Sequence, residues 1–173
     1  MDWRGGGTVA FLARDRLRLK MKNTDLRYKL TVALELRSSM RDEVLRELVS
    51  AIPELKKRPD AQETLLKALQ DRESLHSTGI GDGIALPHAR NALVGLVDHT
   101  VIVLGRHAQG IPFGAIDGKP AQLFFLLAAP TVTDHLAVLA RISRVLLDGK
   151  LRQSLLTVQS EDKAAVLLKE AGL

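Results

Sequence analysis

Apolar residues recur three and four positions apart in three stretches of the chain, the spacing of one buried helix face. This periodicity predicts helices over residues 40–52, 59–71 and 134–147. Each helix should pack its apolar stripe on a core and leave the opposite face in water. The inward positions are Val44, Leu45, Leu48, Val49, Ile52, Leu65, Leu66, Leu69, His135, Val138, Leu139, Ile142, Val145 and Leu146.

The residues that flank these stretches are typical of helix ends. Ser38-Ser39 precedes the first helix as a candidate cap, and Pro53 follows it as a stop. Asp60 offers an acidic cap for the second helix. Thr131 or Thr133 should cap the third helix, and Gly149 should end it.

Two runs rich in apolar and β-branched residues predict buried strands over residues 100–104 and 121–129. An Asp117-Gly118 turn lies between them, so the two strands should form a hairpin with a long loop. Residues 30–36 have the composition and partial alternation of a third strand.

Two short helices complete the predicted elements, one over residues 150–158 and one that Ser160 caps and Gly172 ends. The strands are clustered between blocks of helices instead of alternating with them. This order predicts an α+β fold, an αβα three-layer sandwich with a mixed sheet of about four to five strands and helices on both faces.

Charge divides the chain into two parts. Residues 1–30 hold eight Lys or Arg and three Asp, so the remainder carries equal numbers of basic and acidic residues. We therefore expect a basic N-terminal extension over residues 1–28, with a short edge strand in residues 11–21, and one domain over residues 29–173. A basic excess confined to an extension does not favour a nucleic-acid-binding fold.

The absence of cysteine excludes disulfides, thiolate zinc sites and cysteine nucleophiles, and fits a reducing compartment. No apolar run reaches the length of about 18 residues that a membrane span needs. The first residues lack the apolar core of a secretory signal. These features predict a cytoplasmic protein without a membrane span.

Residues 71–90, D-R-E-S-L-H-S-T-G-I-G-D-G-I-A-L-P-H-A-R, hold the chemistry of the chain. The glycines do not fit a dinucleotide loop, because the third comes one residue early and no helix follows. No two histidines have the spacing of a helical zinc motif, and no serine has a nucleophile elbow. We expect no cofactor and no metal.

His88 is the candidate nucleophile that remains. Pro87 restricts the backbone before it, and we expect the glycine turn to form a low platform around it. Imidazole near its ordinary pKa of about 6.5 is neutral and nucleophilic at cellular pH. A histidine with a structural role stays the alternative. His76, His99 and His107 are expected to be ordinary surface or loop residues.

Glu73, a gap of six residues and the run I-G-D-G-I-A-L-P-H-A resemble the active-site signature of type 2 IIA domains of the bacterial phosphotransferase system. This family includes fructose and mannitol IIA proteins and nitrogen-regulatory IIA proteins. The resemblance spans roughly residues 34–173, and the sequence of the motif is most similar to that of the nitrogen-regulatory branch. It implies the same sandwich fold.

The resemblance implies roles for three residues. His88 would be phosphorylated on Nε2 by an HPr-type histidine phosphocarrier, Arg72 would stabilise the phosphate oxygens, and His135 would orient or tune the site. Arg72 in an exposed ion pair with Asp71 or Glu73, and His135 as a core histidine, are the alternatives that the residues leave open.

The downstream role also has alternatives. The family implies a phosphoryl carrier for nitrogen or metabolic regulation, or a fructose/mannitol-type IIA that donates phosphate to a IIB domain in sugar uptake. A third hypothesis is a regulatory binding module that controls a transporter or kinase by its phosphorylation state.

Overall fold

The computed structural model describes residues 27–90 and 93–173, and these form a five-stranded sheet in the order β1-β4-β5-β3-β2. β1 pairs parallel with β4, β4 antiparallel with β5, β5 parallel with β3, and β3 antiparallel with β2. The predicted mixed sheet and the β4–β5 hairpin are confirmed. The strands are β1 (Tyr28–Ala33), β2 (Gly79–Gly81), β3 (Ile84–Ala85), β4 (Thr100–Ile111) and β5 (Ala121–Ala128).

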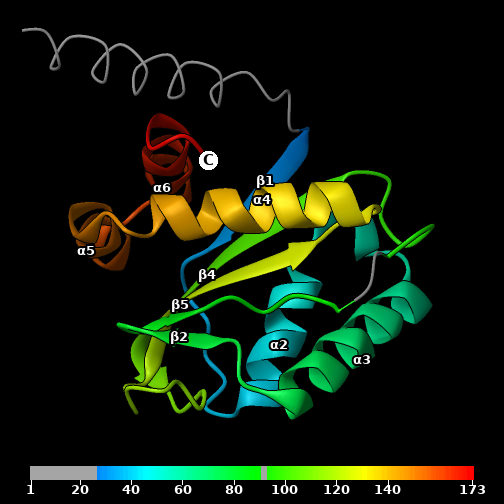
Figure 1. Cartoon of the computed structure of the whole chain (residues 1–173), viewed down its shortest axis with the longest axis horizontal. Coiled ribbons are helices and arrows are strands. Elements are labelled where there is room, and N and C mark those ends of the chain that lie inside the picture. Colours follow the sequence, from blue (N-terminus) through cyan, green and yellow to red (C-terminus); the bar gives the residue numbers. More distant parts are fainter. Residues whose placement is uncertain (1–26, 91–92) are drawn as a thin grey trace, which may run out of the picture.

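Helices cover both faces of this sheet, as the order of the elements predicted. Figure 1 shows α4 on one side of the sheet and α2 and α3 on the other. The helices are α2 (Arg41–Ser50), the short 3-10 helix η2 (Pro53–Leu55), α3 (Pro59–Leu75), α4 (Val132–Val145), α5 (Gly149–Thr157) and α6 (Glu161–Glu170). The fold is the expected αβα sandwich.

Strand β5 shows how the sequence builds two cores. Phe124, Leu126 and Ala128 pack with α2 and α3. Leu123, Phe125 and Leu127 pack on the other face with α4, α5 and α6. Because side chains alternate across a strand, an unbroken apolar run is what a strand buried on both faces requires.

Several predicted helix ends are wrong. Met40, not a serine, occupies the cap position of α2 and makes no side-chain cap. The N–H groups of Arg37 and Ser38, before the helix, donate to the Glu47 carboxylate. Arg58 is the cap position of α3 and makes no side-chain cap, since a guanidinium has no acceptor for the helix N–H groups. Pro59 occupies the first helical position. Gly149 begins α5 instead of ending α4.

Strand β4 is longer than the apolar run that predicted it, so the expectation for His107 is wrong. The strand continues to Ile111 and places His107 in the interior, with 7% of its surface exposed. Gly105 lies in the same strand, two residues before His107. A Cβ added there would be 2.5 Å from Leu48 Cδ2 and 2.7 Å from Leu36 Cδ1. Any larger residue here would have to displace these two leucine side chains, so glycine allows β4 to pass close to α2.

No helix within residues 27–90 and 93–173 is long and apolar enough to cross a lipid bilayer. Most of the predicted N-terminal extension, including the edge strand expected in residues 11–21, lies outside the described residues. Within them, the chain enters the sheet at Tyr28.

The cap of α4 gives a prediction for stability. Thr131 Oγ1 accepts the Asp134 N–H at 3.1 Å and donates to the Asp134 carboxylate at 2.6 Å. Thr131→Ala should lower the free energy of unfolding by about 1 kcal/mol, the usual cost of a lost cap, as measured by urea unfolding. Ser143→Ala, which removes an exposed hydroxyl from the same helix, should change stability by less than about 0.5 kcal/mol. A Thr131→Ala variant as stable as wild type would contradict this assignment.

Candidate phosphoryl-transfer site

Three segments that are distant in the sequence meet where the parallel strands β3 and β5 end. His88 follows β3 and pairs with Leu127 near the end of β5. α4 begins just after β5 and carries His135 in its first turns. The last turn of α3 supplies Arg72. The structure brings together all three candidate residues, because the carboxyl ends of parallel strands lie at one edge of a sheet.

The backbone fixes which nitrogen of His88 is free. Nδ1 lies 2.7 Å from the carbonyl oxygen of Leu86. A carbonyl can only accept, so Nδ1 carries the hydrogen and donates it. Nε2 therefore carries no hydrogen and keeps its lone pair. This Nδ1–H tautomer is the one that a nucleophilic Nε2 requires.

Arg72 contacts that free nitrogen. Its Nε donates to His88 Nε2 at 3.3 Å, and its Nη1 donates to the carbonyl oxygen of His76 at 2.8 Å. These contacts differ from the alternative of a surface ion pair with Asp71 or Glu73. The helix α3 extends four residues past the predicted end at Asp71, and this extension places Arg72 on a rigid element.

His135 stands beside His88 and is half-buried, as its place on the apolar stripe of α4 predicted. The ring centroids are 5.4 Å apart and the ring planes are tilted by 51°. Burial, and then the neighbouring His88, lower the pKa of His135. The His135 ring thus lies next to His88, and the pKa of each ring is shifted toward the neutral form.

The pKa of His88 lies below its ordinary value. Burial is the main cause, and the positive charge of Arg72 acts in the same direction. The hydrogen bond to Leu86 and the negative charge of Glu73 oppose the shift. The neutral form of His88 therefore predominates at pH 7, because the net shift lowers a pKa whose ordinary value is already below 7.

The arrangement suits an anionic electrophile. A neutral nitrogen nucleophile lies next to a guanidinium that can hold equatorial oxygens of a phosphoryl group. An open hollow of about 410 Å³ adjoins the site between α3 and the chain after His88, and Arg72 lines it together with Leu75, Ala89 and Leu93. Within residues 27–90 and 93–173 no three histidine or acidic side chains cluster as metal ligands do.

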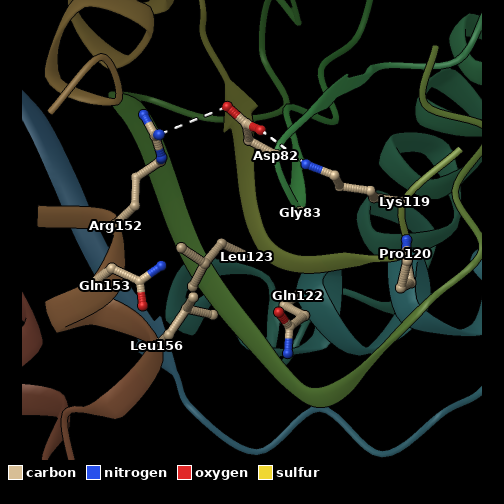
Figure 2. Close-up of a pocket in the computed structure, with 9 residues that line it drawn as sticks. All are labelled: Asp82, Gly83, Lys119, Pro120, Gln122, Leu123, Arg152, Gln153 and Leu156. Carbon is tan, nitrogen blue, oxygen red and sulfur yellow. Dashed lines mark hydrogen bonds and ion pairs between the residues drawn. The ribbon is translucent and has the colours of Figure 1, made fainter. Parts of the chain in front are cut away.

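The glycine turn lies away from this site, so the expected platform around His88 is wrong. Ile84 pairs with Leu123 and His88 with Leu127, which separates the two ends of this segment by about 13 Å along β5. At the far end, Figure 2 shows Asp82 between Lys119 and Arg152, over a pocket of about 310 Å³. The turn and the histidine are at opposite ends of β3.

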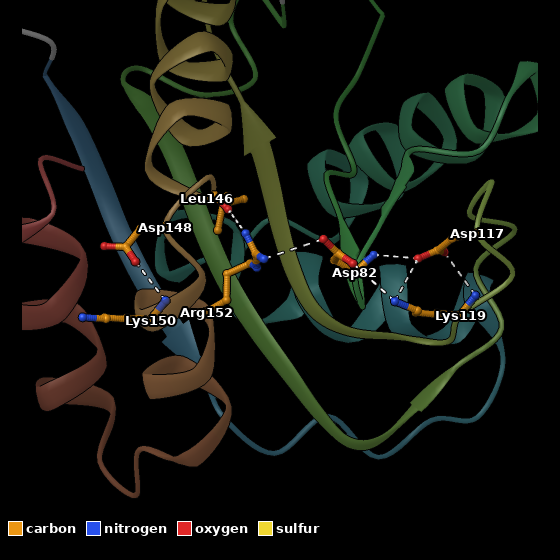
Figure 3. Close-up of polar contacts among 7 residues, drawn as sticks. All are labelled: Asp82, Asp117, Lys119, Leu146, Asp148, Lys150 and Arg152. Carbon is orange, nitrogen blue, oxygen red and sulfur yellow. Dashed lines mark hydrogen bonds and ion pairs between the residues drawn. The ribbon is translucent and has the colours of Figure 1, made fainter.

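The glycine turn serves the fold instead. Asp82 has a positive φ of 52° between two glycines, and its N–H donates to the Asp117 carboxylate at 2.8 Å. Lys119 reaches Asp82 at 3.3 Å, and Arg152 of α5 reaches it at 3.6 Å (Figure 3). The turn thus joins the β4–β5 loop to α5, and the dinucleotide interpretation gains no support from it.

Sequence reasoning missed two groups at the site. The carbonyl oxygen of Leu86 selects the tautomer of His88, and a backbone group gives no signal in the sequence. Glu73 was recognised only as part of a signature, although it is 3% exposed and bonded to Thr78. A helix pattern extended to Leu75 would have placed Glu73 on the inner face. His76 and His99 are exposed, as expected.

Comparisons with known proteins agree with this fold. The sequence profile of "Phosphoenolpyruvate-dependent sugar phosphotransferase system, EIIA 2" matches residues 26–171. The chain is 38% identical over 144 residues to the fructose-specific EIIABC component of Bacillus subtilis, a match of 82% of this chain and 22% of that much longer protein. It is 31% identical over 137 residues to a nitrogen regulatory protein of Bradyrhizobium diazoefficiens, covering 78% of this chain and 86% of the relative.

A solved structure is similar over most of its length. The nitrogen regulatory protein IIA-Ntr from Neisseria meningitidis superposes with a TM-score of 0.70 at 28% identity, covering 80% of this chain and 95% of that one. The profile match extends over most of the described fold, including the segments that carry Arg72, His88 and His135. The chain belongs to the EIIA type 2 family of the phosphoenolpyruvate-dependent sugar phosphotransferase system.

Proposed function

We propose that this protein is a cytoplasmic phosphoryl carrier that accepts phosphate on His88 Nε2 from a phosphorylated HPr-type carrier. The observation that carries the proposal is the pair of contacts on the imidazole: Leu86 holds the Nδ1 hydrogen, and Arg72 meets the free Nε2. Membership of the EIIA type 2 family supports the same chemistry. No cofactor or metal is needed.

The transfer step is an exchange of one phosphorus–nitrogen bond for another. Arg72 Nε–H first releases the lone pair of His88 Nε2, to which it donates in the resting structure. The lone pair then attacks phosphorus as the bond to the carrier's phosphohistidine breaks, and that electron pair returns to the carrier nitrogen. Nδ1 keeps its hydrogen and its bond to Leu86. Arg72 steadies the equatorial oxygens, and His135 orients the group from the other side.

Incubation with a phosphorylated HPr-type protein tests the proposal. The expected product carries one phosphate that is labile in acid and stable in base, and NMR should assign it to His88 Nε2. Absence of label from the wild-type protein would contradict the proposal.

Two downstream roles are supported by relatives with different names. The nitrogen regulatory relative favours a signal for nitrogen or metabolic regulation. The fructose-specific relative favours a donor to a IIB domain in sugar uptake. Transfer of phosphate from the labelled protein to a fructose or mannitol IIB would establish the second. Retention of phosphate, with binding to a transporter or kinase that depends on it, would establish a regulatory module.

The lowered pKa of His88 predicts the pH dependence of its chemistry. Burial and Arg72 hold the pKa below 6.5, so the neutral nucleophile should persist at pH 6.5 and disappear only at lower pH. In the unfolded chain the same ring takes up its proton near pH 6.5, so its contribution to stability becomes less favourable as the pH falls below that value. NMR titration of the His88 ring measures the midpoint, and a midpoint at or above 6.5 would contradict this prediction.

A further inference from the structure

Glu73 is a buried carboxylate beside the site that the proposed transfer step does not use. It lies on the last turn of α3 and is 3% exposed. Its oxygens accept the N–H of Thr78 at 2.9 and 3.1 Å and the hydroxyl of Thr78 at 2.6 Å. A buried carboxylate is costly unless hydrogen bonds compensate it, and the bonds from Thr78 provide that compensation here.

The bonds of Glu73 continue to the nucleophile. The carbonyl oxygen of Thr78 accepts the N–H of Leu86 at 3.0 Å. The carbonyl oxygen of Leu86 accepts the Nδ1 hydrogen of His88 at 2.7 Å. Glu73 thus connects α3, which carries Arg72, to the strand segment that carries His88.

Glu73 carries its negative charge at the carboxyl end of α3, where a negative charge is not expected. The carboxyl end of a helix already has a partial negative charge, so a carboxylate there is unfavourable. A neutral glutamine could accept from the Thr78 N–H and donate to its hydroxyl, and would cost less to bury. Hydrogen bonding alone therefore does not account for an acid at this position.

The proposed chemistry gives the charge a use. When Nε2 bonds to phosphorus and Nδ1 keeps its hydrogen, the imidazole ring gains a positive charge. Arg72 opposes that charge and Glu73 favours it. We propose that Glu73 is a positioning residue of the phosphoryl-transfer site, which holds Arg72 and His88 in register through Thr78 and Leu86 and stabilises the charged ring as it forms. This inference rests on the proposed function.

The variant Glu73→Gln tests it, because glutamine can keep the bonds to Thr78 and removes only the charge. In the unphosphorylated protein, the pKa of His88 should fall further while Nδ1 keeps its hydrogen. NMR titration of the His88 ring measures both. Phosphorylation by the HPr-type carrier and by the small donor phosphoramidate should slow by about tenfold. The melting temperature should not fall.

Glu47→Gln is the matched control. Glu47 also binds two backbone N–H groups, those of Arg37 and Ser38, at a different part of the fold. Its substitution should leave the titration of His88 and both phosphorylation rates unchanged. Thr78→Val, which removes one of the bonds to Glu73 without removing the charge, should slow both rates less than Glu73→Gln does.

The two hypotheses fail in different ways. A wild-type protein that takes no phosphate would contradict the proposed function. If His88 titrates in the Glu73→Gln variant as it does in wild type, and both phosphorylation rates are unchanged, the proposed role of Glu73 is overturned. This holds even if Glu73→Ala lowers stability. A wild-type-like Glu73→Gln variant together with a destabilised Glu73→Ala variant would identify Glu73 as a structural residue only.

Discussion

Replacing His88 by asparagine should abolish phosphorylation, with a loss of at least about 10³-fold, because the side chain then has no Nε2 to attack phosphorus. Asparagine is the sharpest substitution. Its amide nitrogen can occupy the place of Nδ1 and donate to the carbonyl oxygen of Leu86. The variant should therefore stay folded and lose only the nucleophile. Incorporation of acid-labile phosphate from the HPr-type carrier measures the effect.

Other histidines provide the controls for this result. His76→Asn and His99→Asn alter exposed rings and should leave incorporation unchanged. His135→Gln should slow the reaction and keep the label, because that ring stands beside His88 and does not itself accept phosphate. Equal labelling of His88→Asn and wild type would refute His88 as the acceptor and return it to a structural role.

The layers of the fold were predictable because they follow from periodicity alone. The run of apolar residues in β5 could be a strand only if both faces were covered, and its side chains do alternate between the two cores. The inward position of His135 followed in the same way from its place on the stripe of α4. Element type and buried face are local properties of the sequence.

The ends of elements depend on partners that are distant in the sequence. Ser38 does not cap α2, because its N–H donates to Glu47 of that helix and Met40 occupies the cap position. Strand β4 continues through Arg106 because the guanidinium finds the carbonyl oxygens of Leu34, Leu155 and Leu156. A charged residue in a strand pattern normally indicates an end, and only the folded chain provides these acceptors.

The three residues of the candidate site could be named from the sequence, whereas their geometry could not. The signature identified His88 together with the glycines, but it did not show that β3 separates them. It also did not show the hydrogen bond that selects the tautomer, since Leu86 acts through its backbone. Proximity in sequence suggested a platform, whereas an extended segment moves its two ends apart by about 3.3 Å per residue.

Arg72→Ala should slow phosphorylation by about 10²-fold, the usual loss when one fixed donor to a developing negative charge is removed. The planar guanidinium contacts His88 Nε2 through Nε and the His76 carbonyl oxygen through Nη1, so it is held in the path of the incoming phosphoryl group. Arg72→Lys should recover little of the rate, because a single ammonium cannot make both contacts. Rates of transfer from the HPr-type carrier provide the measurement.

The pH at which these rates are compared decides what they mean. Arg72 lowers the pKa of His88, so its removal raises that pKa and reduces the neutral fraction near pH 6. At pH 8 the ring is neutral in both proteins, and any remaining loss reports the stabilisation of phosphate oxygens alone. Arg58→Ala is the matched control, since Arg58 also donates to a backbone carbonyl, that of Leu96, and lies about 21 Å away along α3. A variant at Arg72 that matched wild type at pH 8 would limit this arginine to adjusting the protonation of His88, and the phosphate would then need another cation.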